Sequence, residues 1–154
     1  MSTKIGTHAS FSYQLIADIS AAEQLGCNDS GKVFMVDQSS AFTINLPKLS
    51  TQLAGWQARF VIKTADSNAV HIMAWGLTSS GGTGDSGTTN DGDTVILKEM
   101  ATTDAGAATA SSQDGVIFVS GATVGDSIDI FTDGTSWYAT SSVADAAHSD
   151  DIDG

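Results

Sequence analysis

The chain has 154 residues, and its 18 acidic and six basic residues give a formal net charge of −12 at pH 7. Because so acidic a protein repels phosphate backbones and anionic lipid surfaces, neither nucleic acid nor membrane is expected as a partner. The single cysteine excludes an intrachain disulfide and a four-thiolate zinc site, and no apolar run approaches the ~20 residues of a membrane-spanning helix.

The N-terminal part of the chain predicts a flexible arm followed by a strand. Residues 1–10 lack the basic and then apolar segments of a secretory signal, so synthesis in a cytoplasm is expected. Residues 11–19 begin with alternating apolar and polar side chains, a strand pattern. Residues 20–26 suit a short helix, and residues 27–31 predict a turn.

Two different strand patterns follow. The continuous apolar run of residues 33–36 is typical of a strand buried on both faces. Residues 42–46 alternate strictly between apolar and polar side chains, and Pro47 ends this strand because it cannot donate a backbone hydrogen bond. Residues 48–54 predict about two helical turns.

Residues 58–64 and 70–75 predict a hairpin with a short polar loop between them. The first of these strands carries Arg59 and Lys63 on the face opposite its apolar side chains. The pair would therefore bury one face and expose the other.

The second half of the chain alternates loops with strands. Residues 76–93 have no periodicity and almost no apolar content, so a long loop is expected. A strand begins at residues 95–97, and residues 101–112 predict a second loop. Residues 116–119 form a further apolar strand, and residues 127–143 predict a hairpin.

The hairpin turn is expected at Asp133-Gly134, because glycine tolerates the positive φ of tight hairpin turns. Trp137 and Tyr138 follow on one strand and must point to opposite faces, since side chains alternate along a strand. One ring is therefore expected in the core, and the other is expected at an outer surface or a subunit contact.

These elements predict an all-β protein with one domain. Residues 11–143 are expected to form a β-sandwich or barrel of about eight short, mostly antiparallel strands, after an arm at residues 1–10. Residues 144–154 predict an acidic tail with one large apolar residue, Ile152, as a weak anchor. No internal sequence repeat is evident.

No catalytic residues are expected. Of the three histidines only His71 lies on a predicted strand, and no G-x-S-x-G nucleophile motif is present. Cys27 lies in a polar turn without an identifiable base, and Glu23 and Glu99 are the only glutamates, so no facing carboxylate pair is indicated. The sequence therefore does not predict an enzyme.

No metal or cofactor site is predicted either. Asp85, Asn90, Asp91 and Asp93 are oxygen donors of the kind that Ca²⁺ prefers, but their order is not that of an EF-hand, so a bound calcium ion stays open. The glycines of residues 81–87 lack the lysine and helix of a phosphate-binding loop.

The aromatic residues allow two interpretations. Trp56, Trp75 and Trp137, together with Tyr138, could line a sugar-binding surface. Aromatic side chains are also the usual fillers of β-sheet cores and subunit interfaces, and this interpretation is favoured.

Three segments, residues 29–47, 55–74 and 125–141, together resemble small β-modules in virion proteins of tailed bacteriophages. The shared pattern is a strand ending in T-I-x-L-P, a glycine before an F-x-I strand, and a D-G-T-x-W-Y hairpin. Asp133, Gly134, Trp137 and Tyr138 are the family-marker residues of that hairpin.

The resemblance implies a homotrimer without a cofactor. Such modules occur in head decoration proteins, head fibres and tail fibres. The short chain, with no repetitive shaft, favours a capsid decoration (cement) protein, which is made in the host cytoplasm and binds the major capsid protein on the outside of the virion head. The alternative is a fibre or receptor-binding module that contacts the host surface.

The contact residues implied by this resemblance stay open. Residues 76–93 and the acidic tail extend beyond the simple module, so either segment could touch a neighbouring subunit. Phe11 and Tyr13 offer apolar contacts for docking of the N-terminal arm, although a core strand is an equal alternative for them.

Overall fold

The computed structural model describes residues 15–75, 95–101, 115–144 and 149–152. Within these residues the chain is all β, apart from two short 3-10 helices, η1 and η2. The elements are β1 (Ile16–Ile19), β2 (Glu23–Gln24), η1 (Cys27–Asp29), β3 (Val33–Asp37), β4 (Phe42–Asn45), η2 (Thr51–Leu53), β5 (Gln57–Thr64), β6 (Val70–Met73), β7 (Val95–Ala101), β8 (Gly115–Phe118), β9 (Ser127–Thr132), β10 (Trp137–Val143) and β11 (Ser149–Ile152).

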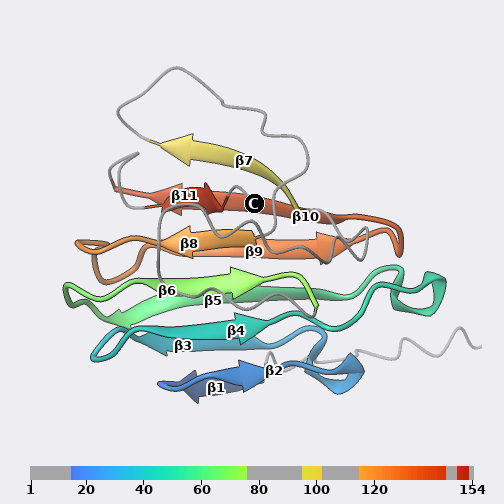
Figure 1. The fold of residues 1–154 in the computed structure, drawn as a ribbon, viewed down its shortest axis with the longest axis horizontal. Helices are drawn as coiled ribbons and strands as arrows, with labels where there is room; N and C mark the ends of the chain where they lie inside the picture. Colours follow the sequence, from blue (N-terminus) through green and yellow to red (C-terminus); the bar gives the residue numbers. More distant parts are fainter. Residues whose placement is uncertain (1–14, 76–94, 102–114, 145–148, 153–154) are drawn as a thin grey trace, which may run out of the picture.

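The strands form two sheets that lie one behind the other in Figure 1. The six-stranded sheet has the order β1-β3-β5-β9-β10-β7, and the five-stranded sheet has the order β11-β8-β6-β4-β2. Neither sheet closes on itself, so the architecture is a sandwich and not a barrel. The prediction of a single all-β domain is confirmed.

From β1 to β9 the chain changes sheet after every strand. Strands β1, β3 and β5 therefore run parallel in one sheet, and β2, β4 and β6 run parallel in the other. Each successive pair forms one coil of the chain, stacked on the coil before it (Figure 1). This structural repeat has no counterpart in the sequence pattern.

The prediction of mostly antiparallel strands is wrong. Between the described strands, five of the nine pairings are parallel and four are antiparallel. The alternation of side chains is the same in both kinds of pairing, because it reports which face is buried and not which strand lies alongside.

The predicted hairpin of residues 58–64 and 70–75 is also wrong. β5 pairs with β3 and β9, whereas β6 pairs with β4 and β8 in the other sheet. A short polar connection serves equally as a hairpin loop or as a crossover between sheets. The inner faces of both strands are buried in the shared core, which the crossover makes possible.

Three smaller expectations also change. The helix expected in residues 20–26 is replaced by β2, and residues 48–54 form only the single short turn of η2. The strand of residues 33–36 is not buried on both faces, because Phe34 and Val36 are buried whereas their neighbours Val33 and Met35 are half-buried.

The core between the sheets is built from the inward-facing side chains of both. Phe34 stacks on Phe60 with ring centroids 5.2 Å apart, and Trp56 meets Trp137 edge to face, also at 5.2 Å. Burial of such a side chain is worth ~1.5–3 kcal/mol, and edge-to-face contact adds ~0.5–1.5 kcal/mol. Trp56 also donates a hydrogen bond from Nε1 to the carbonyl of Gly26, 3.1 Å away.

The connection from β2 to β3 is tied to the start of β5. The backbone N–H of Gly31 donates to the carbonyl of Gln57 at 2.6 Å, and the N–H of Gln57 donates to Oγ of Ser30 at 3.3 Å. These bonds hold the Gly31 turn against the first residue of β5, where the sheet surface is recessed.

The remaining predictions concern the ends of the chain and its loops. Residues 149–152 of the expected acidic tail form β11, which pairs antiparallel with β8. Phe11, Tyr13 and the loop of residues 76–93 lie outside the described residues. In the described part of the chain, no helix is long and apolar enough to cross a membrane.

Candidate functional site

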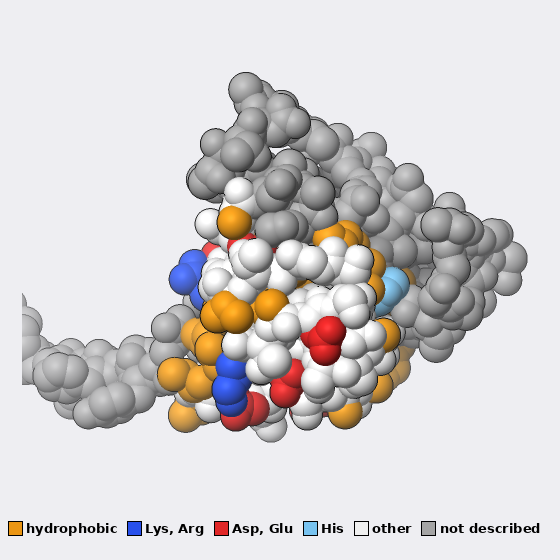
Figure 2. Space-filling view, turned by 90° about the vertical axis from the view of Figure 1, so that its left-hand side faces the viewer, with side chains coloured by type: hydrophobic (Ala, Val, Ile, Leu, Met, Phe, Trp, Pro, Cys, Tyr) orange, Lys and Arg blue, Asp and Glu red, His pale blue; other side chains and the backbone are white. Residues whose placement is uncertain are grey.

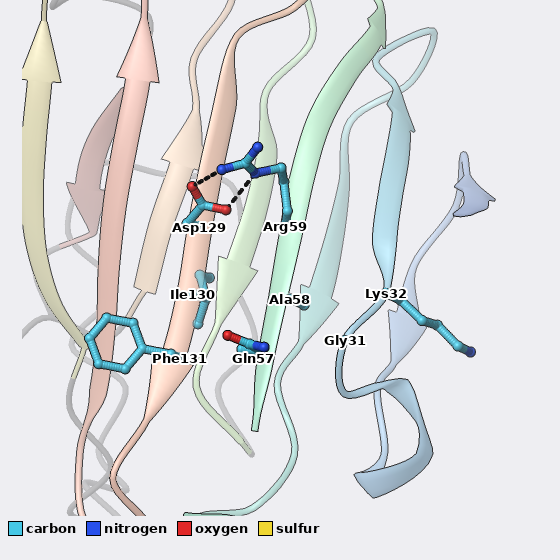
Figure 3. Close-up of a pocket in the computed structure, with 8 residues that line it drawn as sticks. All are labelled: Gly31, Lys32, Gln57, Ala58, Arg59, Asp129, Ile130 and Phe131. Carbon is cyan, nitrogen blue, oxygen red and sulfur yellow. Dashed lines mark hydrogen bonds and ion pairs between the residues drawn. The ribbon is translucent and has the colours of Figure 1, made fainter. Parts of the chain in front are cut away.

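A groove lies on the outer face of the six-stranded sheet, where the turn before β3 meets β5 and β9 (Figure 3). Its volume is about 310 Å³. The residues that line it are Gly31, Lys32, Gln57, Ala58, Arg59, Asp129, Ile130 and Phe131.

The strand alternation explains which groups face the groove. β5 and β9 are antiparallel, with Gln57 opposite Phe131 and Arg59 opposite Asp129. These four residues point outward, whereas the residues between them on each strand are buried in the core. The groove therefore has side-chain walls of mixed polarity over a floor of sheet backbone.

Arg59 and Asp129 form a two-bonded ion pair across the strands (Figure 3). The Nε and Nη2 atoms of Arg59 donate to the two carboxylate oxygens of Asp129, each over 2.6 Å. This hydrogen bond and the carboxylate charge raise the pKa of Arg59. Because both side chains are close to half-exposed, the pair is worth at most ~1 kcal/mol of stability, so its main effect is to fix two planar polar groups in one orientation.

Two other basic side chains near the groove, Lys32 and Lys63, are paired as well. Lys32 points away from the ion pair in Figure 3 and contacts the carboxylate of Asp29, and Lys63 contacts that of Asp18 at 2.8 Å. Partial burial alone would raise the pKa of Asp29, but the hydrogen bonds from Lys32 and from the backbone lower it. In Figure 2, which views the molecule from the left-hand side of Figure 1, Lys or Arg side chains lie beside Asp or Glu side chains. Around the groove, Lys32, Arg59 and Lys63 are each paired with an aspartate, in a strongly acidic chain.

The predicted hairpin of residues 127–143 is present, with β9 and β10 joined by a four-residue connection from Asp133 to Ser136. Asp133 Oδ1 accepts hydrogen bonds from the backbone N–H groups of Thr135 and Ser136, at 2.8 and 2.9 Å. Gly134 has a φ of +92°, as the turn requires. The turn is built by the residues that predicted it, although it is longer than a two-residue turn.

Trp137 and Tyr138 lie on opposite faces of β10, as the alternation predicts. Trp137 is fully buried, whereas Tyr138 faces outward and stacks on Phe131 with ring centroids 5.1 Å apart and an interplanar angle of 17°. Phe131 is 47% exposed. The outward ring of the hairpin therefore belongs to an aromatic pair formed across two strands.

Hydrogen bonds hold this pair in place. The hydroxyl of Tyr138 donates to Asp133 Oδ2 at 3.1 Å. The pKa of Asp133 is well below its usual range, chiefly because the hydroxyl and the backbone N–H of Thr135 donate to it, with further bonds from Ser136 and Tyr138. The same bond and the negative charge of Asp133 raise the pKa of Tyr138.

The sequence predicted the burial of some aromatic residues correctly, but it did not predict one aromatic contact. Trp56 and Trp137 fill the core, and Trp75 is 36% exposed, so the three tryptophans do not form one sugar-binding surface. The pairing of Phe131 with Tyr138 was missed. It follows from the hairpin register, because a four-residue connection places these two residues directly opposite each other.

Two further candidate residues, His71 and Cys27, lie in the described part of the chain. His71 is half-buried on β6, its Nδ1 atom has no partner among the described residues, and burial lowers its pKa. Cys27 is exposed. In residues 15–75, 95–101, 115–144 and 149–152, no group of three or more histidine, cysteine, aspartate or glutamate side chains could hold a metal ion. The possible calcium ligands from Asp85 to Asp93 lie outside these ranges.

Comparisons with protein-family models, curated proteins and solved structures found no match for this chain. The resemblance to bacteriophage virion modules therefore stays a prediction. The fold, the groove and the exposed edges of the sheets are the basis on which a function is proposed.

Proposed function

We propose that the chain is a structural protein of a tailed-bacteriophage virion, a decoration protein that binds the outside of the head as a homotrimer. The observation that carries this proposal is the open end of the sandwich formed by β1 and β2. Each is the last strand of its sheet, and the two lie at the same end of the molecule (Figure 1).

The β1 edge also carries exposed apolar side chains. Leu15 is 62% exposed and Ile16 is 71% exposed. One edge of β1 has no strand beside it among the described residues, so its backbone N–H and C=O groups are available to an extended segment of another subunit. Strand pairing and burial of these two side chains would both stabilise the contact. Burial contributes ~1.5–3 kcal/mol for each side chain that becomes fully buried.

The charge distribution supports docking on this side. A chain with a net charge of −12 is repelled by most acidic surfaces, but near β1 the side chains of Lys32, Arg59 and Lys63 are each paired with an aspartate. A neutral contact avoids the like-charge repulsion that would otherwise oppose binding. Three such contacts in one trimer would add avidity, because each binding event raises the effective concentration for the next.

Binding of the purified protein to undecorated phage heads tests this proposal. We expect saturable uptake, heads that resist higher temperature, and a mass in solution of three chains. Replacement Ile16→Asp should weaken uptake by about tenfold or more, because it places a charge in the apolar contact.

The matched control is Val124→Asp. Val124 is 67% exposed on the connection between β8 and β9, and β3 and β5 separate β9 from β1 in the sheet. Uptake unchanged by both substitutions would refute the β1 contact. Binding to host cells but not to heads would overturn the decoration function in favour of a fibre or receptor-binding module, and a monomeric mass would remove the trimer.

A further inference from the structure

We propose that the groove on the outer face of the six-stranded sheet binds a neutral carbohydrate, with one sugar ring packed against Phe131 and its hydroxyls on Gln57 and the Arg59–Asp129 pair. This site is separate from the β1 edge, because β3 lies between β1 and β5. The inference goes beyond decoration of a head and does not depend on it.

The aromatic pair provides the apolar contact. A sugar ring presents a face of C–H groups that packs on an aromatic ring and so removes apolar area from water. Tyr138 stacks on one face of Phe131, which leaves the rest of this half-exposed ring for a ligand. Because the hydroxyl bond to Asp133 holds Tyr138, the aromatic pair loses little side-chain freedom on binding.

The polar groups suit hydroxyls. Gln57 lies directly opposite Phe131 across the strands, and no hydrogen bond of its side-chain amide is seen among the described residues. An amide both donates and accepts, as a sugar hydroxyl does. Two residues further along β5, the Arg59–Asp129 pair adds further donors and acceptors held in a plane.

The charge and size of the groove select the class of ligand. Both basic residues of the groove, Lys32 and Arg59, are already paired with carboxylates, so the groove has no cation free to attract a phosphate, a sulfate or a nucleic acid. Its volume of about 310 Å³ lies at the small end of the range of ~300–1,000 Å³ typical of ligand pockets. A neutral terminal sugar residue fits these limits better than a long or anionic chain.

Amide NMR spectra of the isotope-labelled full chain provide the test, with the methyl glycosides of glucose, galactose and N-acetylglucosamine as probes. We expect saturable shifts for at least one probe, centred on Gly31, Gln57 and Phe131. A sulfated heparin disaccharide is the anionic comparison and should bind more weakly. The substitutions Phe131→Ala and Gln57→Ala should each weaken binding by about tenfold, and Val124→Ala is the matched control that should not.

Three outcomes would refute the proposed sugar site. If no neutral glycoside gives saturable shifts, if only the sulfated sugar binds, or if Phe131→Ala and Gln57→Ala both bind as wild type, the proposal is wrong. Should Phe131→Ala fail to fold, Phe131→Ser and Gln57→Ala carry the same test. Uptake of the folded Gln57→Ala variant by phage heads is measured alongside, so that loss of sugar binding and loss of decoration are read separately.

Discussion

Gly134, in the turn between β9 and β10, should be among the positions least tolerant of a methyl group. Its φ is +92°, a region that costs a residue with a side chain ~1–2 kcal/mol. A Cβ there would also lie 3.0 Å from the carbonyl oxygen of Ser50 and 3.1 Å from Cα of Thr51. Both neighbours are backbone atoms in or next to η2, so they cannot rotate away.

The magnitude follows from these two effects. Overpacking against backbone costs ~1–3 kcal/mol, and the reduced freedom of the unfolded chain returns ~0.4–1 kcal/mol. For Gly134→Ala the free energy of unfolding should therefore fall by about 3 kcal/mol. At ~2–4 °C for each kcal/mol in a domain of this size, the melting temperature should fall by roughly 6–12 °C.

Gly125→Ala is the matched control. Gly125 has a φ of +98°, but a Cβ there meets no atom within 4 Å. There is no overpacking, so the conformational cost less the gain from the unfolded chain leaves about 1 kcal/mol, and the melting temperature should fall by roughly 2–4 °C. Thermal unfolding followed by circular dichroism, with urea unfolding as a second measure, compares both variants with the wild type. Equal losses in the two variants would refute the contact between the hairpin turn and η2.

Three further predictions concern single side chains. Ser141 is fully buried and its Oγ has no partner among the described residues, so Ser141→Ala should raise the free energy of unfolding by about 1 kcal/mol, and a lower urea midpoint would contradict this. Because the pKa of Asp133 is lowered in the folded chain, its carboxylate stabilises the fold fully above the ordinary pKa of 3.8, and this stabilisation is lost as the pH falls through the folded-state pKa. Asp133→Ala should therefore have a lower melting temperature than wild type at neutral pH, and the melting temperatures of the two proteins should converge in strong acid. Burial lowers the pKa of His71, so the unfolded chain binds more protons than the folded chain and stability should fall as the pH drops below 6.5. His71→Gln should flatten this part of the profile of melting temperature against pH. An unchanged slope would contradict the role of His71.

The sequence predicted local structure well wherever one face of a strand is buried. The alternation in Phe42–Asn45 and in Gln57–Thr64 identifies the inward side chains correctly, and the Asp133-Gly134 pair identifies the turn. These features depend on neighbours in the sequence, which is why a pattern can predict them.

The pairing of the strands was not predictable in the same way. Nothing in β5 or β6 says that they lie in different sheets, because their period of two only requires a core on one side of each. The groove was missed for the same reason, since it joins the turn at Gly31 to β5 and β9 and exists only after these distant segments pair. Within it, only the contact of Phe131 with Tyr138 is local to one hairpin.

The passage of the chain from one sheet to the other after each strand has a consequence for how the protein folds. Most strands that pair are separated along the chain by a strand of the other sheet: β4 lies between Val33 and its partner Arg59, and β8 lies, with β9, between Val95 and its partner Trp137. Among the strands that the structure describes, only β9 and β10 are neighbours both in sequence and in a sheet. Such non-local topologies close large loops before they gain contacts, so folding on a scale of ~milliseconds to seconds is expected, with the β9–β10 hairpin as the natural place for it to begin.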